Sequence, residues 1–171
     1  MNRIGEFHKV SFQRYVKDVY GSIDDPGIWK MAEDEYLNIK MPRRATSGSA
    51  GYDICAPVGF SMMPGGNIKI PTGIKVEMED GWVLAIFPRS SMGFKHFMGL
   101  ANTVGIIDSD YICSDNEGHI WIKVVNNGHG MLSVEAGQAF AQGVFLPFGV
   151  TYSDDADGVR NGGMGSTDTA K

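Results

Sequence analysis

Hydrophobic residues along most of this chain come in short runs of β-strand length. Apolar and polar residues alternate over 74–78, a continuous apolar run occupies 82–87, and a second run, interrupted only by Lys123, occupies 120–125. Turn-forming pairs such as Asp80-Gly81 separate these runs, and frequent turns between short strands are typical of sandwiches and barrels. No rhythm of alternating strands and helices is present. We therefore expect residues 39–152 to form an all-β core with the double sheet of a jelly-roll-like β-sandwich.

The two ends of the chain have different patterns. Asp25 and Pro26 suit the cap and first position of a helix that ends near Tyr36. Ser11 suits the N-cap of an earlier helix, whose apolar face would contain Phe12, Tyr15, Val16 and Val19. We expect residues 1–38 to be a short helical N-terminal extension packed on the outside of the core. Residues 153–171 are rich in Gly, Asp and Ser, which predicts a flexible C-terminal arm.

Charge and composition exclude several classes of protein. The net charge of −5 and the scattered arrangement of the 15 Lys and Arg residues argue against nucleic-acid binding, which needs clustered basic residues. The first residues lack the apolar stretch of a secretion signal, and no apolar run approaches membrane-spanning length. We therefore expect a cytoplasmic protein with no membrane partner. The four histidines fit no zinc pattern and are expected on the surface or in loops; they are His8, His96, His119 and His129.

Five short segments carry the candidate chemistry. Each is a weak signal alone, but together they supply carboxylates, phosphate-binding donors, one aromatic ring and a glycine-rich clamp. This inventory suits hydrolysis of a nucleoside triphosphate with a metal ion held mainly by the substrate. The segments are Ala50–Asp53, Pro88–Ser91, Gly105–Tyr111, Gly137–Gln142 and Arg160–Thr167.

Asp108 is the candidate catalytic residue. It follows Ile106 and Ile107, so it would end a buried strand and point into a cleft, where a carboxylate can deprotonate an attacking water. An ordinary aspartate in a turn is the alternative on the bare sequence. Asp110 lies two residues further on and would point the opposite way in extended backbone, so we expect it to be structural.

Phosphate binding is expected from three other segments. Arg89 offers a planar fork for phosphate oxygens, and Ser90 and Ser91 offer hydroxyl groups. Gln142 adds an amide, unless it only pairs locally within its strand. The glycine-rich tail can fold around a polyphosphate as an anion nest, with donors from Arg160, Gly165, Ser166 and Thr167.

In this order, the five segments resemble those of the homotrimeric all-β dUTPases of bacterial or phage type, over about residues 39–167. The resemblance implies a domain-exchanging homotrimer with shared active sites that converts dUTP to dUMP and pyrophosphate. It makes Asp108 the base for water attack on the α-phosphorus and a contact for the sugar 3′-hydroxyl. Mg²⁺ would sit on the substrate phosphates, with Asp53 reaching it through water.

The same resemblance implies how the nucleoside is read. Tyr111 would pack under the deoxyribose and exclude a 2′-hydroxyl. A hairpin between Asn102 and Ile120, which includes Gly105 and Ile107, would read uracil through backbone groups. This chain departs from the family pattern twice: the loop after Tyr111 is longer, and Met164 stands where an aromatic ring usually covers the base.

Two other functions remain open on the sequence. The chain could be a dUTPase-fold regulatory module, whose protein partner contacts the N-terminal helices or the loop around Cys113. It could also be a related dCTP deaminase, but that chemistry needs a glutamate placed for deamination, and the segment Gly105–Tyr111 resembles the diphosphatase instead.

Overall fold

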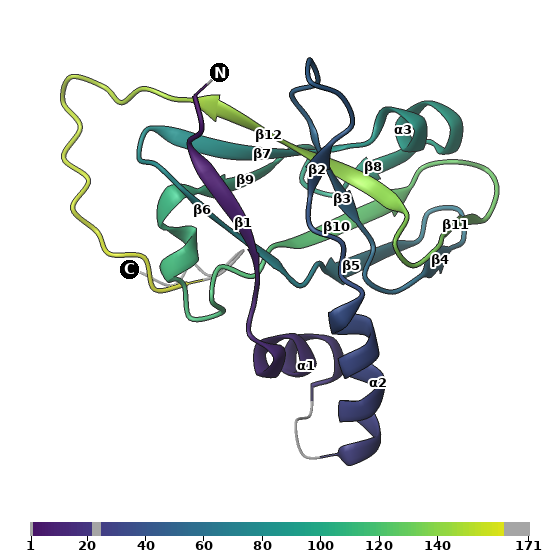
Figure 1. The fold of residues 1–171 in the computed structure, drawn as a ribbon. Coiled ribbons are helices and arrows are strands. Elements are labelled where there is room, and N and C mark those ends of the chain that lie inside the picture. Colours follow the sequence, from purple (N-terminus) through teal and green to yellow (C-terminus); the bar gives the residue numbers. More distant parts are fainter. Residues whose placement is uncertain (1, 22–24, 163–171) are drawn as a thin grey trace.

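Short β-strands make up most of the molecule, as the hydrophobic pattern predicts (Figure 1). The computed structural model describes residues 2–21 and 25–162. The helices in this part are α1 (Phe12–Tyr20), α2 (Pro26–Leu37), α3 (Ser90–His96) and the 3₁₀ helix η1 (Ser109–Cys113). The strands are β1 (Gly5–Lys9), β2 (Arg43–Arg44), β3 (Tyr52–Cys55), β4 (Phe60–Met62), β5 (Asn67–Pro71), β6 (Ile74–Met78), β7 (Trp82–Pro88), β8 (Met98–Leu100), β9 (Gly105–Asp108), β10 (Trp121–Asn126), β11 (Leu132–Val134) and β12 (Ala139–Pro147).

Two layers of strands enclose the main core, which confirms the expected jelly-roll-like β-sandwich. The upper layer in Figure 1 is a five-stranded sheet in the order β2-β3-β12-β7-β9. The lower layer contains the three-stranded sheet β5-β10-β8 and the pair β11-β4. Alternate residues of both layers point inward and exclude water from one another. The fully buried side chains of this core include Ile54, Leu84, Ile86, Ile107, Ile120, Val124 and Phe140.

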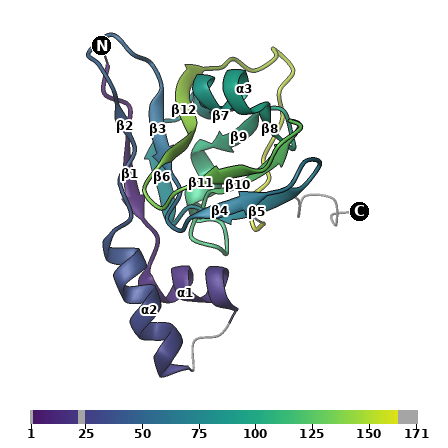
Figure 2. The same cartoon turned by 90° about the vertical axis from the view of Figure 1, so that its right-hand side faces the viewer.

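The N-terminal helices form as predicted and have a small core of their own. The Ser11 side chain caps α1 by accepting from the N–H of Arg14, and Asp25 caps α2 in the same way. Both helices lie below the sandwich (Figures 1 and 2), around a cluster of Val10, Tyr15, Val16, Ala32, Ile39 and Ile74. None of the described helices combines the length and apolar character needed to cross a membrane.

Strand β1 is an element that the sequence pattern did not reveal. It pairs along its whole length with β6, from Gly5 opposite Met78 to Lys9 opposite Ile74. Its five residues include Glu6, His8 and Lys9 and show no strong alternation, so pairing with β6 and the packing of Phe7 against the core stabilise it. The N-terminal segment therefore contributes a strand as well as two helices.

The described part of the C-terminal arm contains no helix or strand. After β12 the chain leaves the sheet, runs down the outside of the molecule and reaches η1 (Figure 1). This path brings Arg160 back to the segment that contains Asp108.

Candidate active site

Three adjacent strands bring together the first, second and fourth sequence segments. Gln142 on β12 is paired directly with Asp53 on β3, and Arg89 follows the last residue of the neighbouring strand β7. The Nε of Arg89 lies 2.9 Å from Oδ1 of Asp53, and Nε2 of Gln142 donates to the carbonyl oxygen of Pro88 at 3.2 Å. Asp53, Arg89 and Gln142 are called the sheet half-site below.

Small and polar residues border the sheet half-site. Gly51 lies so close to Gln142 that a Cβ at this position would collide with its Oε1. Ser90 and Ser91 begin α3 directly after Arg89, with Ser90 exposed and Ser91 half-buried. Arg89 therefore lies beside Asp53, with Ser90 and Ser91 directly after it, where strand β7 ends.

A second group of site residues lies where β9 passes into η1. Nη1 of Arg160 lies 2.7 Å from Oδ2 of Asp108 and 2.8 Å from Oδ1 of Asp110. The Arg160 guanidinium also covers the Tyr111 ring, 5.2 Å from its centroid. Although burial lowers it, the hydrogen bonds that Arg160 donates to both carboxylates raise the pKa of Arg160. Asp108, Asp110, Tyr111 and Arg160 are called the loop half-site below.

The expectation that Asp110 points away from Asp108 was wrong. It assumed extended backbone after Asp108, but η1 begins at Ser109 and turns the chain. The turn brings both carboxylates onto the same nitrogen of Arg160. Two carboxylates rather than one therefore lie in the loop half-site.

The two half-sites occupy opposite ends of the same outer sheet face. Residues paired directly across neighbouring strands share a face, as do alternate residues of one strand. Val83 of β7 is paired with Asp108. Along this strand Val83 lies about 20 Å from Arg89, at the rise of an extended strand. Three rows therefore cross this face, namely Asp53–Gln142–Phe87, Val144–Ala85–Ile106 and Leu146–Val83–Asp108.

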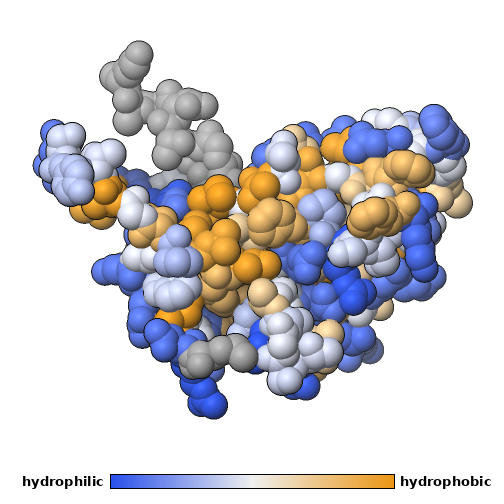
Figure 3. Space-filling model, turned by 90° about the horizontal axis from the view of Figure 1, so that it is seen from above, coloured by the Kyte–Doolittle hydropathy of each residue, from blue (hydrophilic) through white to orange (hydrophobic). Residues whose placement is uncertain are grey.

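Apolar side chains fill the space between the half-sites. Ile106 on β9 is 54% exposed and Leu146 on β12 is 42% exposed, although strand residues of this kind are usually buried. The space-filling view from above shows hydrophobic side chains gathered on this side of the molecule (Figure 3). A polar half-site therefore lies at each end of an exposed apolar strip.

Comparison with known proteins shows the family of the chain. The sequence model of the dUTPase family matches residues 37–168. The chain belongs to the dUTPase family. It is 43% identical over 132 residues to the deoxyuridine 5′-triphosphate nucleotidohydrolase of Lactococcus lactis, a match that covers 75% of this chain and 88% of the relative.

Solved dUTPase structures share the fold. The crystal structure of the Streptococcus mutans dUTPase matches with a TM-score of 0.63 and 33% identity, over 85% of this chain and 97% of the other. A mutant dUTPase from phage phi11 of S. aureus matches with a TM-score of 0.60 and 21% identity, over 72% and 94%; its structure describes the coordination of a structural Mg(II) ion.

The predicted uracil-reading segment of this dUTPase differs from a simple hairpin. Strand β9 pairs with β7, whereas β10 pairs with β5 and β8, because η1 and the loop that follows carry the chain from one layer to the other. A small pocket lies between the layers at this point, lined by Ile86, Leu100, Asn102, Gly105, Trp121 and Ile122. Two predicted residues, Asn102 and Gly105, therefore line one pocket, while the Ile107 side chain is buried in the core.

His119 lies in a loop, as expected, but its burial was not predicted. Its side chain is fully buried, with Nδ1 2.6 Å from Oδ2 of Asp18 and Nε2 accepting from the N–H of Gly73 at 2.7 Å. The sequence offered no signal for this, since Asp18 and His119 are 101 positions apart. Other residues of the fifth segment, Met164, Gly165, Ser166 and Thr167, lie outside the described residues.

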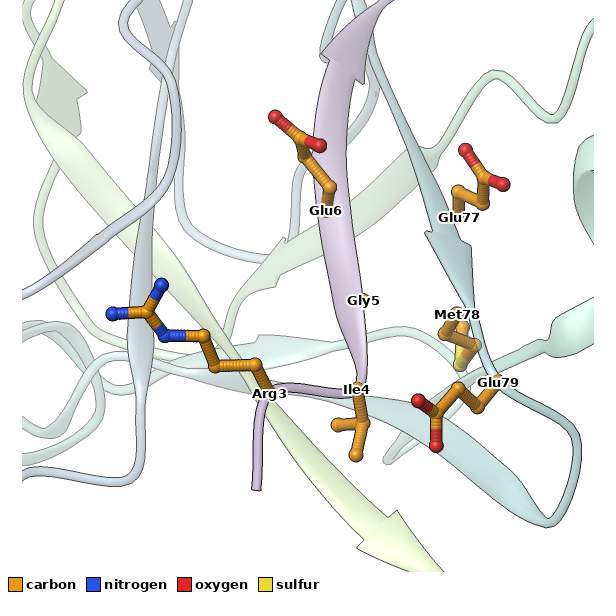
Figure 4. Close-up of a pocket in the computed structure, with 7 residues that line it drawn as sticks. All are labelled: Arg3, Ile4, Gly5, Glu6, Glu77, Met78 and Glu79. Atoms are coloured by element: carbon orange, nitrogen blue, oxygen red, sulfur yellow. The ribbon is translucent and has the colours of Figure 1, made fainter. Parts of the chain in front are cut away.

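The described residues contain no cluster of three or more metal-ligating side chains. A magnesium ion held mainly by substrate phosphates does not need such a cluster, and the half-buried carboxylate of Asp53 fits a contact through water. Another hollow lies between β1 and β6 and is lined by three glutamates together with Arg3 (Figure 4). It contains none of the predicted site residues, so the presence of a hollow alone does not identify the site.

Proposed function

We propose that this chain hydrolyses dUTP to dUMP and pyrophosphate, at active sites that copies of the chain share in a homotrimer. The observation that carries the proposal is the separation of the two half-sites on one sheet face. A triphosphate held by Arg89 does not reach Asp108 of the same copy, because about 20 Å of strand lies between them. A second copy, packed on the apolar strip, brings its own loop half-site to the sheet half-site of the first.

A closed ring of identical subunits accounts for the separation of the two half-sites. Each copy carries one half-site at each end of the strip, so a head-to-tail contact repeats around a threefold axis and leaves no half-site unmatched. The exposed Ile106 and Leu146 side chains then become buried between copies. The arm that carries Arg160 is the third contribution to each site.

In the proposed reaction Asp108 accepts a proton from water as the water oxygen attacks the α-phosphorus. The bond from that phosphorus to the bridging oxygen breaks, and pyrophosphate leaves with the electron pair. Arg89, Ser90, Ser91 and Gln142 hold the phosphates, and Arg160 moves from the two aspartates to the substrate. A magnesium ion on the phosphates, near Asp53, would neutralise part of their charge.

Nucleoside selection is proposed to come from the loop half-site. The Tyr111 ring packs against the deoxyribose, so a ribose 2′-hydroxyl would collide with it, and the sugar reaches the ring when Arg160 moves away. Strand β9 is the last strand of its sheet in the described residues, and an edge strand offers backbone donors and acceptors. Such groups near Asn102 and Gly105 suit the fixed hydrogen-bonding pattern of uracil.

Co-expression of two variants that are each impaired at low dUTP concentration tests whether sites are shared. Arg89→Ala removes the sheet half-site and Asp108→Asn the loop half-site, each with a different affinity tag. In mixed trimers purified through both tags, about one site in three combines an intact half from each variant, because the ring is closed. We expect pyrophosphate release, at dUTP concentrations well below KM, at about a third of the wild-type rate.

Mixed trimers no more active than the parents would show that each site lies within one copy. A monomer in sedimentation would contradict the trimer itself. The matched control is a single chain that carries both substitutions, which stays inactive when mixed with itself. Ammonia release from dCTP, measured on the same wild-type preparation, would favour the deaminase alternative instead.

A further inference from the structure

One face of helix α1 contacts the 114–119 loop, the part of the chain that follows Tyr111. The Ser11 hydroxyl donates to Oε1 of Glu117 at 2.7 Å, and the Ser11 N–H donates to Oε2 at 2.8 Å. Nη2 of Arg14 donates to the carbonyl oxygen of Asp115 at 2.9 Å. Residues three or four apart share a helix face, so the start of α1 is aimed at this loop.

Asp18 extends the same contact face into the protein interior. Because Nε2 of His119 accepts from the N–H of Gly73, its proton must be on Nδ1, which donates to Oδ2 of Asp18 at 2.6 Å. The other oxygen of Asp18 pairs with Nη1 of Arg14 at 3.2 Å. Burial works against ionisation, but the bonds to His119 and Arg14 hold the pKa of Asp18 below its ordinary value. A charged carboxylate thus fixes the tautomer and the orientation of a fully buried histidine.

The backbone of His119 in turn holds Tyr111. The Tyr111 hydroxyl donates to the carbonyl oxygen of His119 at 3.0 Å, and Nδ2 of Asn116 donates to the tyrosine oxygen at 2.9 Å. The ring is 3% exposed and sits at the end of this chain of bonds. A continuous path therefore runs from Asp18 through His119 to Tyr111.

We propose that Asp18 is a positioning residue for Tyr111, so that helix α1 sets how strongly the site selects deoxyribose over ribose. This inference rests on the sugar-reading role proposed above for Tyr111. Without the carboxylate, His119 loses its fixed tautomer and its carbonyl shifts, which gives the Tyr111 ring freedom to move away from a 2′-hydroxyl. The N-terminal extension would then act on specificity rather than on the chemical step.

The measurement is the ratio of kcat/KM for dUTP to kcat/KM for UTP. In Asp18→Ala we expect this ratio to fall about fivefold or more, since loss of a steric fit costs specificity, while kcat for dUTP changes little. Asp18→Asn keeps an oxygen that accepts from Nδ1 and should restore most of the ratio. Val16→Ala is the matched control, because it weakens the packing of the same helix and removes no hydrogen bond to the loop.

Tyr111→Ala separates this inference from the proposed function. If Asp18 acts through Tyr111, the double variant Asp18→Ala/Tyr111→Ala has the same ratio as Tyr111→Ala alone. An unchanged ratio in Tyr111→Ala would overturn the sugar-reading role and this inference with it. A lowered ratio in Tyr111→Ala, with Asp18→Ala no different from Val16→Ala, would overturn the inference alone. Should Asp18→Ala not fold, Ser11→Ala removes the side-chain cap of α1 together with one bond to Glu117, and it should lower the ratio about twofold.

Discussion

The two half-sites of this dUTPase are built by different means. The sheet half-site consists of side chains on neighbouring strands, and the register of β3, β12 and β7 alone brings Asp53, Gln142 and Arg89 together. The loop half-site depends on η1, on an arm that returns over 50 positions and on a helix near the N-terminus. Regular pairing therefore positions the candidate phosphate-binding residues and places Asp108 opposite Val83, whereas long-range side-chain contacts position Tyr111 and Arg160.

The largest expected effect comes from the loop half-site. In Asp108→Asn the shape of the side chain is kept but the base is lost, so we expect kcat for dUTP to fall about 10²–10⁴-fold with KM little changed. Pyrophosphate release under saturating dUTP measures this. Asp110→Asn is the matched control, because Asp110 also forms an ion pair with Arg160 but is not proposed to accept a proton.

Equal losses in the two aspartate variants would mean that the carboxylates act as a unit. A loss of less than about tenfold in Asp108→Asn would remove it from the role of general base.

The sheet half-site should lose binding rather than chemistry. Arg89→Ala removes charged hydrogen bonds to phosphate, each worth about 1.5–3 kcal/mol, so we expect kcat/KM for dUTP to fall about 10–100-fold. Arg89→Lys keeps the positive charge but not the planar fork of the guanidinium, so its kcat/KM should lie between those of the wild type and Arg89→Ala. Arg3→Ala, at the hollow between β1 and β6, is the control, and an equal loss there would show that net charge alone is responsible.

Sequence reasoning succeeded where structure is local and failed where it is not. The alternation over β6 and the apolar run of β7 predicted strands because period-two burial is a property of neighbouring residues. The caps Ser11 and Asp25 were likewise visible within four positions. Pairing of β1 with β6 and burial of His119 depend on partners far along the chain. The pattern near Asp108 assumed extended backbone and missed the turn that gathers Asp110.

The loop that contains Gly118 should tolerate substitution less well than the ordinary turn that contains Gly81. Gly118 has a φ of +70°, and a Cβ there would lie 2.6 Å from Cα of Ile112 and 3.0 Å from the carbonyl oxygen of Tyr111. Gly81 has a φ of +81° with nothing within 4 Å. We expect Gly118→Ala to lower the free energy of unfolding by about 2–4 kcal/mol and Gly81→Ala by about 1 kcal/mol. Urea unfolding at one protein concentration measures the stability of both variants. Equal losses of stability would mean that the loop rearranges around the new Cβ without further destabilisation.

The smallest expected effect comes from Gly51, beside the sheet half-site. A Cβ at Gly51 would collide with Oε1 of Gln142, but that atom is the end of a flexible side chain. Gly51→Ala should therefore leave stability almost unchanged while it moves the amide away from its hydrogen bond to Pro88. We expect KM for dUTP to rise about threefold to tenfold, the equivalent of one neutral hydrogen bond.

Gly48→Ala is the matched control, because a Cβ there meets nothing within 4 Å. Its KM should stay within about twofold of the wild type, as expected of a surface change. If Gly51→Ala lowered stability as much as Gly118→Ala, the sheet half-site would be as tightly constrained as the loop. If KM stayed constant in Gly51→Ala, Gln142 would have no contact with the phosphates, and the sheet half-site would consist of Arg89 and Asp53 with the serines of α3.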